Sequence, residues 1–258
     1  MPLEQVAFHL ARFANRVVSP VMDTRRAIAA LKDIPWFVRS YAAYARAAGQ
    51  RPKLANLYPC LGDRKTDAGT ATGDYFHQDL WAARKVFKSG VSEHVDVGSR
   101  VDGFVAHCAV FTKVIYVDLR PLPSDVPNIT SRIGSFDHLP FEDGSVPSLS
   151  SLHVVEHIGL GRYGDPLDPG GTTKAMLELR RVLAPGGNLF LGLPIGQERV
   201  EFNAHRITNP ETVLGAMEGL ELVDFAAVEK NGRPVSHCRP QTYRDVGWAF
   251  GLFHFRRS

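Results

Sequence analysis

The chain has 258 residues, of which 44% are hydrophobic and 22% are charged, and a formal net charge of +3. A chain of this length and apolar content can bury a full core, which excludes global disorder and fits one large domain with an appendage. Nucleic-acid binding normally needs clustered basic side chains, and the mild net charge does not indicate them. We therefore expect no nucleic-acid partner.

Cysteine usage and hydropathy bear on the location. Cys60, Cys108 and Cys238 lie far apart without metal-ligand spacing, which favours a reducing compartment and no zinc. No segment approaches about 20 apolar residues, and the first residues lack the pattern of a signal peptide. We therefore expect a cytoplasmic protein.

The first 50 residues place apolar side chains at helical spacing among seven lysines and arginines, against three acidic residues. This pattern is typical of amphipathic helices. Two interpretations stay open: helices that lie peripherally on an anionic membrane, or helices that pack on the rest of the chain or on a second subunit. Residues 51–73 read as an irregular connection rich in proline and glycine. We expect a helical extension with its connection over residues 1–72 and a main domain over residues 73–258.

From Asp74 onward, strand and helix patterns alternate, which predicts an α/β fold with a mostly parallel sheet and helices on both faces. The expected helices cover about 78–88, 173–183 and 210–218, and another starts near Val101. The expected strands cover 94–98, 113–118, 129–135, 148–154, 188–193, 220–228 and 247–255. Because no helix pattern separates the last two strands, we predict a seven-stranded sheet that ends in an antiparallel hairpin.

The first strand runs into the loop HVDVGSRVDGF, from His94 to Phe104, at the sheet edge where such folds bind ligands. In a dinucleotide site a second glycine lets the pyrophosphate approach the backbone, and Arg100 stands at that position here. A nicotinamide dinucleotide is therefore disfavoured. S-Adenosylmethionine has no pyrophosphate, and Asp96, Gly98 and Ser99 suit a loop that would bind it.

Acidic and aromatic side chains follow the next two strands. Asp118 ends the second strand, at the place of a ribose-binding carboxylate. Phe136 and Asp137 follow the third strand and would hold adenine, by stacking and by accepting from its exocyclic amine. Each residue alone has a structural alternative, a loop cap for Asp118 and a core position for Phe136. Their joint order at successive strand ends favours an adenosylmethionine site.

Several segments of the chain resemble class I S-adenosylmethionine-dependent methyltransferases: DVGSRVDGF, YVDLRP, GSFDHLPFEDGSV, LHVVEHIGLGRYGDPLDPGG, LRRVLAPGGNLFLGLPIG and FNAHRI. Within that class, HIGLGRYGDPLDP, YPCLGDR and FHQDLWAARKVF resemble the group known as domain of unknown function 268. The resemblance covers roughly residues 36–230. It implies a Rossmann-like methyltransferase fold with S-adenosyl-L-methionine as cofactor. Members are similar to enzymes of bacterial surface-glycan assembly, so we expect a saccharide hydroxyl as acceptor.

Methyl transfer is an in-line displacement, so alignment of the two reactants would contribute about 7 to 11 kcal/mol. A hydroxyl acceptor must also lose its proton, and a positioned base contributes roughly 10²- to 10⁴-fold. We expect His157 to be this base, Glu156 to orient it, and His205 to be a further catalytic residue. A structural or cofactor-side role for Glu156 and His157 stays open. A divalent metal held by these residues with Asp165 also stays open, although their spacing is not that of a compact ligand motif and we expect none.

Two loops are expected to build the acceptor pocket: the glycine-rich segment 159–171 and residues 202–207. The acceptor-binding candidates are Arg162, Tyr163, Asp165 and Asn203. The cofactor-binding candidates are Asp96, Gly98, Ser99, Arg100, Asp118, Leu119, Phe136, Asp137, His153 and Gln78. Each assignment has a structural alternative. Segment 159–171 would be an inert ordered loop, and the residues around Gln78 would be an ordinary helix start.

The sequence thus predicts a methyltransferase that acts on an oxygen of a saccharide or of another small polar acceptor. Two other classes stay open. One is a protein that binds adenosylmethionine without catalysis. The other is a methyltransferase for a small-molecule nitrogen or for nucleic acid, and nucleic acid is disfavoured by the mild charge and by the absence of an Asn-Pro-Pro-aromatic sequence.

Overall fold

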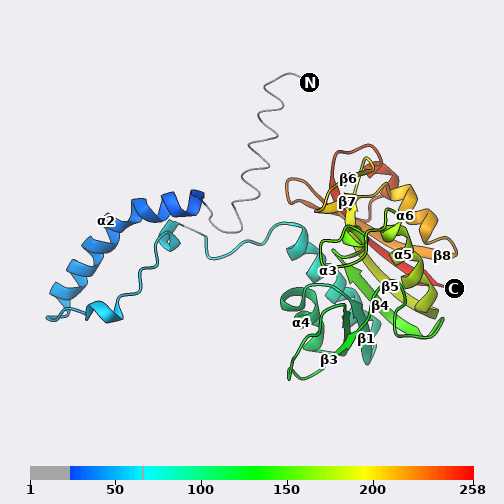
Figure 1. The fold of residues 1–258 in the computed structure, drawn as a ribbon, viewed down its shortest axis with the longest axis horizontal. Helices are drawn as coiled ribbons and strands as arrows, with labels where there is room; N and C mark the ends of the chain where they lie inside the picture. Colours follow the sequence, from blue (N-terminus) through cyan, green and yellow to red (C-terminus); the bar gives the residue numbers. More distant parts are fainter. Residues whose placement is uncertain (1–23, 66) are drawn as a thin grey trace, which may run out of the picture. The chain divides into compact units, whose positions relative to one another are not determined.

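The computed structural model describes residues 24–65 and 67–258. The chain divides into two compact units, Met1–Thr70 and Ala71–Ser258 (Figure 1). The part of the expected helical extension before residue 24 lies outside the described residues.

The described residues of the first unit contain one long helix, α2 (Thr24–Ala47), followed by two short 3-10 helices, η1 (Leu54–Asn56) and η2 (Asp63–Lys65). The irregular segment is tied to α2 by charge: the carboxylate of Asp33 is fully buried and pairs with Arg64 and Lys65. Within the described ranges, no helix is long and apolar enough to cross a membrane.

Eight strands of the second unit form one sheet in the order β3-β2-β1-β4-β5-β10-β8-β9. Their bounds are β1 (Glu93–Val97), β2 (Lys113–Asp118), β3 (Ile129–Ile133), β4 (Val146–Leu152), β5 (Leu183–Ile195), β8 (Leu220–Glu229), β9 (Pro234–Ser236) and β10 (Ala249–Arg257). The strands from β3 to β5 are parallel, and β10 is antiparallel to both of its neighbours. The expected mixed sheet is confirmed. The strand beyond the predicted seven is β9, whose three residues are too few to give a periodic signal.

Helices cover both faces of this sheet (Figure 1). Their bounds are α3 (Asp74–Ser89), η3 (Val101–Val105), α4 (Ala106–Ala109), η4 (Val155–His157), α5 (Gly171–Val182), α6 (Pro210–Ala216) and η5 (Pro240–Tyr243). Side chains from α3, η3 and α4 form one buried cluster with the sheet, and side chains from α5 and α6 form another. The helix expected near Val101 is two short pieces rather than one continuous helix.

Strand β2 contributes side chains to both buried clusters, one on each face of the sheet. Ile115 and Val117 pack in the cluster with α5 and α6, whereas Val114 and Tyr116 pack in the cluster with α3 and α4. Side chains alternate between the faces of a strand, so a strand buried on both faces is apolar throughout. This explains why KVIYVD is recognisable as a central strand from sequence alone.

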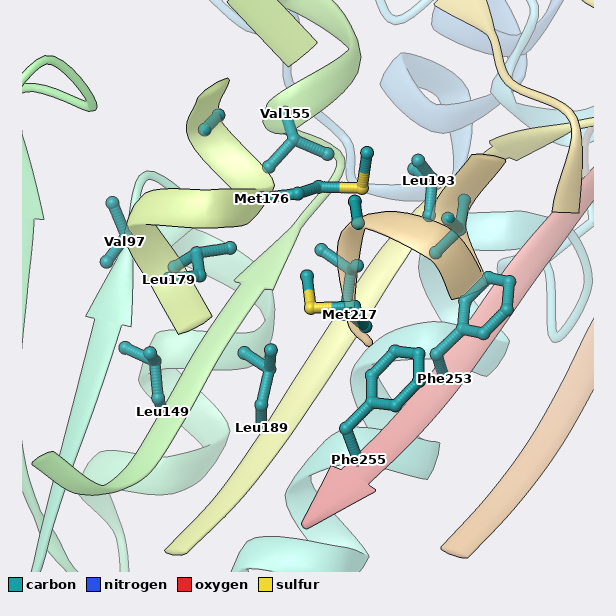
Figure 2. Packing of buried hydrophobic residues seen from close by; sticks show 14 of the residues in the cluster. Val97, Leu149, Val155, Met176, Leu179, Leu189, Leu193, Met217, Phe253 and Phe255 are labelled. Carbon is teal, nitrogen blue, oxygen red and sulfur yellow. The ribbon is translucent and has the colours of Figure 1, made fainter. Parts of the chain in front are cut away.

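The larger cluster holds the antiparallel addition to the parallel strands. Phe253 and Phe255 of β10 are almost completely buried beside Leu189 of β5 and Met217 (Figure 2). Burying one such side chain contributes about 1.5–3 kcal/mol. The apolar faces of β5 and β10 therefore fix where the sheet turns antiparallel.

A small hairpin follows β5, made of β6 (Arg199–Glu201) and β7 (His205–Ile207). The sequence predicts only a polar loop here, because strands of three residues carry little pattern. The hairpin makes a separate two-stranded sheet beside the carboxyl end of β5.

We expect Phe253→Ala to lower the free energy of unfolding by about 3–5 kcal/mol, because the ring is fully buried and its removal leaves a cavity. Urea unfolding of the full chain measures this loss. Phe202→Ala is the matched control, because that ring is 75% exposed, and its effect should stay within about 0.5 kcal/mol. Equal effects of the two substitutions would contradict the core assigned to β10.

Candidate functional site

A cavity of about 1040 Å³ opens at the carboxyl ends of β1, β2, β3 and β4. The strand order reverses between β1 and β4, since the chain runs outward to β2 and β3 on one side and to β4 and β5 on the other. At such a reversal the two connecting segments diverge and leave a crevice, which is where open α/β sheets bind ligands.

Most of the predicted site residues come together at this cavity. Those that line it are Gly98, Ser99, Arg100, Asp118, Leu119, Phe136, Asp137, His153, Glu156, His157, Arg162, Tyr163, Asp165 and His205. Three others, Gln78, Asp96 and Asn203, do not line it.

Asp96 lies below the loop after β1 rather than in the cavity. Its fully buried carboxylate accepts hydrogen bonds from the amide of Ser99 at 3.0 Å and from the hydroxyl of Ser99 at 2.6 Å. The hydroxyl of Ser150 on β4 also donates to it. The carboxylate therefore joins the loop to the neighbouring strand, and its contribution to the site is to shape the loop.

A histidine completes this buried polar network. The imidazole of His94 lies 2.7 Å from the hydroxyl of Ser148 and 2.8 Å from that of Ser150. Burial lowers the pKa of His94 to about 3 and raises the pKa of Asp96 to about 6, against the opposing effect of the hydrogen bonds from the serines. His94 is therefore neutral at pH 7 and does not neutralise the carboxylate.

Gly98 gives the loop its shape. Its φ is +77°, and a Cβ added there would lie 2.8 Å from Val154 Cγ1, so a side chain is excluded by both conformation and space. The amide of Gly98 donates to the carbonyl of Val117 at 2.9 Å, and that of Ser99 donates to Asp96. Both amides are thus used inside the fold, and the loop offers the cavity a bare backbone surface.

Arg100, which stands where a dinucleotide site has glycine, pairs with its neighbour on the loop. Its Nε and Nη2 donate to the two carboxylate oxygens of Asp102 at 2.9 and 2.8 Å. Its guanidinium lies over the ring of Tyr75, 5.2 Å from the ring centre. The side chain therefore rests along the edge of the cavity, held by Asp102 and Tyr75.

Every acceptor position of Asp118 is occupied. Oδ1 accepts from the amide of Arg120 at 2.8 Å and from its Nε at 2.9 Å, and Oδ2 accepts from Arg120 Nη2 and from the hydroxyl of Tyr116, both at 3.1 Å. A carboxylate has about four lone-pair positions. Burial alone would raise the pKa of Asp118, but the Arg120 guanidinium and amide hold it below its ordinary value. A new donor at Asp118 must therefore displace an existing one.

The residues after β3 divide between core and cavity. Phe136 is only 8% exposed and belongs to the larger buried cluster, and it also lines the cavity. Asp137 is exposed at the cavity wall. The core position considered for Phe136 is thus confirmed, and a contact of its ring with a ligand stays a prediction.

His157 is nearly buried and has one ring nitrogen engaged. Its Nδ1 lies 2.7 Å from the carbonyl oxygen of Ala204, so this nitrogen carries the proton and donates. Nε2 is left with a lone pair, 3.7 Å from Glu156 Oε1. Burial lowers the pKa of His157, against the raising effect of Glu156, so the imidazole is neutral near pH 7.

The glycine-rich loop is organised by its own side chains. The carboxylate of Asp165 accepts from the amides of Gly159 at 2.6 Å and Tyr163 at 3.2 Å. These bonds occupy the carboxylate that would complete a metal-binding set. Among the described residues, no group of three or more His, Cys, Asp or Glu side chains is placed to hold a metal ion.

Arg206 anchors the same loop from the hairpin β6–β7. It donates to the carbonyl of Asp168 at 2.9 Å and to that of Ile158, at the two ends of the loop. Sequence reasoning placed this arginine near the acceptor, but its buried guanidinium is used in this anchoring. Asn203 lies on the same hairpin, where its neighbour Ala204 supplies the carbonyl that His157 and Arg162 share.

The mouth of the cavity carries Tyr163 between two arginines. The guanidinium groups of Arg120 and Arg162 each lie 5.1 Å from the centre of its ring. Asp74, Arg120 and Lys174 also line the cavity, and the sequence analysis did not assign them to the cofactor or the acceptor. Asp74 could have been found from the sequence, because it is an acidic residue at the start of the helix that precedes the first strand.

We expect Asp96→Asn to gain stability relative to the parent protein as pH rises from 4 to 7. An unfolded aspartate loses its proton near 3.9, whereas Asp96 in the folded protein does so near 6. Between these values a rising pH favours the unfolded parent, and asparagine removes this effect. Urea unfolding of both proteins without ligand at pH 4 and pH 7 measures it. A stability difference that is flat or falls with pH would contradict a buried, weakly acidic Asp96.

Residues 143–237 match the family described as "Caenorhabditis protein of unknown function, DUF268". A curated relative, an uncharacterized 37.1 kDa protein in transposon TN4556 of Streptomyces fradiae, is 34% identical over 70 residues, which cover 27% of this chain and 17% of that protein. The chain therefore matches only a small part of that relative's length.

Solved structures share the fold at low identity. A geranyl diphosphate methyltransferase in complex with SAM has a TM-score of 0.52 and 16% identity, over 70% of this chain and 85% of that one. The [4+2]-cyclase SpnF has a TM-score of 0.51 and 14% identity, over 70% of this chain and 80% of that one. The chain has the Rossmann-like fold of the class I methyltransferases, and residues 143–237 match the DUF268 group that its sequence resembles.

Proposed function

We propose that this protein is an S-adenosylmethionine-dependent methyltransferase that methylates an oxygen of a saccharide or of another small polar molecule. The observation that carries the proposal is that one cavity joins the carboxylates after β2 and β3, the bare loop after β1 and the neutral imidazole of His157. A donor-binding half and a proton-accepting half thus share one space.

The donor half has the groups that adenosylmethionine requires. Asp118 would accept hydrogen bonds from the ribose hydroxyls, and Asp137 would accept one from the exocyclic amine of adenine. Leu119 and Phe136 supply apolar surface beside them. The loop at Gly98 has no side chain to obstruct the ligand. The cofactor would supply an activated methyl group on a sulfonium sulfur.

The cavity volume allows a second molecule. Ligand pockets commonly measure about 300–1,000 Å³, and this one reaches about 1040 Å³. An acceptor can therefore lie beside the donor, toward Arg162, Tyr163 and His205. These side chains offer hydrogen bonds and an aromatic face, which suit a molecule rich in hydroxyl groups.

His157 is the group we assign as general base. Its Nδ1–H is fixed on Ala204, so Nε2 is the nitrogen that would take the proton of the acceptor hydroxyl. Neutral imidazole near pH 7 is the form that can do this. The solved structures of this fold include a methyltransferase and a [4+2]-cyclase, so the proposed reaction depends on these residues and not on the fold.

We expect calorimetric titration with adenosylmethionine to show binding to the parent protein, and Asp118→Ala to weaken it by about 10- to 100-fold. Loss of hydrogen bonds to a charged carboxylate costs about 1.5–3 kcal/mol. Asp143→Ala is the matched control, because that carboxylate also pairs with an arginine but lies outside the cavity. No binding to the parent protein, or undiminished binding to Asp118→Ala, would overturn the cofactor assignment.

Arg120→Ala provides a second arm of the same titration. The guanidinium occupies positions on Asp118 that the ribose needs, so its removal should leave binding at least as tight as in the parent. Weaker binding would instead show that Arg120 itself contacts the cofactor.

We expect His157→Ala to lower methyl transfer by about 10²- to 10⁴-fold while the Kd for adenosylmethionine stays unchanged. The assay follows labelled methyl from adenosylmethionine into a panel of free and nucleotide-linked sugars. His138→Ala serves as control, since that histidine is exposed and does not line the cavity. Full turnover by His157→Ala would remove His157 as the base, and cofactor binding without transfer to any sugar would favour a different acceptor.

A further inference from the structure

His153 lies between two carboxylates. Its Nδ1 is 3.0 Å from Glu156 Oε1, and its Nε2 is in ion-pair contact with Asp74 Oδ2 at 3.2 Å. These acidic residues come from different elements, α3 and η4, on either side of the ring. An imidazole with a carboxylate at each nitrogen is best satisfied when both nitrogens carry protons.

The ring of His153 is also fixed by stacking. Tyr75 lies on one side with the ring centres 4.2 Å apart, and Phe250 lies at 3.8 Å, each within 24° of parallel. The backbone of His153 is in the left-handed region, with a φ of +60°, which non-glycine residues adopt at a cost. Conformation, stacking and two ion pairs together determine one orientation for this ring.

Glu156 connects His153 to His157. Its Oε1 lies 3.0 Å from Nδ1 of His153 and 3.7 Å from Nε2 of His157, so one oxygen faces both rings. Oε2 is buried and has no hydrogen-bond partner among the described residues. The position of this carboxylate is therefore set by His153.

We propose that Asp74 and His153 are positioning residues, which hold Glu156 so that its Oε1 stands beside Nε2 of His157 and thereby sets how strongly His157 holds a proton. This rests on the proposed function for the role of His157 as base. Asp74 and His153 need not touch the acceptor, because they act through the carboxylate between the two histidines.

Charged and titratable groups near His153 come from three segments: α3, η4 and the loop after β1. Asp74, Tyr75 and Asp79 belong to α3, Glu156 and His157 belong to η4, and Arg100 lies over the outer face of the Tyr75 ring. A fourth segment, β10, contributes only the uncharged ring of Phe250. Burial alone would lower the pKa of His153, but the two carboxylates outweigh it and raise it.

Histidine titration by NMR on the full chain without ligand tests the proposal. Loss of a signal in His153→Gln and in His157→Gln assigns the two rings. We expect His153 in the parent to titrate above the ordinary value of about 6.5. Asp74→Asn should lower the His153 midpoint by roughly one unit or more and, because Glu156 then loses its charged partner, should also shift the midpoint of His157, whereas Glu156→Gln should lower both midpoints.

The variants distinguish positioning from general disruption. Asn at position 74 keeps the oxygen that accepts from the amide of Tyr75, so α3 retains its start, and Asp74→Glu should restore a raised His153 midpoint. Asp168→Asn removes a carboxylate from the same cavity that pairs with Lys174, and both midpoints should stay as in the parent.

An unchanged His153 midpoint in Asp74→Asn, or an unchanged His157 midpoint in Glu156→Gln, would overturn the proposal. Because the titration uses neither cofactor nor acceptor, its outcome is independent of whether adenosylmethionine binds. A failed cofactor titration would overturn the proposed function and leave the coupling of the two histidines standing.

Discussion

The reversal of strand order between β1 and β4 is the constraint on which the rest of the structure depends. β1 and β4 are paired in parallel, yet the chain leaves them toward opposite halves of the sheet. Backbone at their carboxyl ends must therefore diverge, and the loop after β1 and the helical turn η4 line the cavity that results. The buried contact of Asp96 with Ser150 joins these two strands directly below that cavity. The hydrogen bond of Ser150 to Asp96 thus joins the two strands at the reversal, and the same carboxylate shapes the loop after β1.

Charge inside the cavity is arranged in short paired units. Asp118 is paired with Arg120, Arg100 with Asp102, and His153 with two carboxylates. His157 differs from these, because its Nδ1 is held by a backbone carbonyl and its Nε2 lies beyond hydrogen-bond distance of Glu156. Pairing lowers the free-energy cost of burying an ionised side chain and keeps that side chain in place. A neutral imidazole with an open nitrogen, in contrast, can still accept a proton.

Several side chains that look alike in sequence have different uses in the structure. Asp165 and Asp118 are both acidic residues at the same sheet edge, but Asp165 accepts from amides of its own loop, whereas Asp118 is covered by the exposed side chain of Arg120. Arg162 reaches the cavity, whereas Arg206 is buried under it as an anchor. Sequence spacing places all of them near the site, and which atoms are already occupied depends on contacts between distant segments.

The sequence by itself determined the layered α/β fold, the order of its long elements and the edge of the sheet where the cavity lies. The continuous apolar run of strands such as 113–118, and glycines required by positive φ, are local properties that the chain displays directly. Tertiary structure decided the rest: the short strands β6, β7 and β9, the burial of Asp96 and Gln78, and the pairing of Asp74 with His153 across α3 and η4. These features depend on segments far apart in the chain, which come together only when the whole sheet packs. No periodic sequence pattern therefore predicts them.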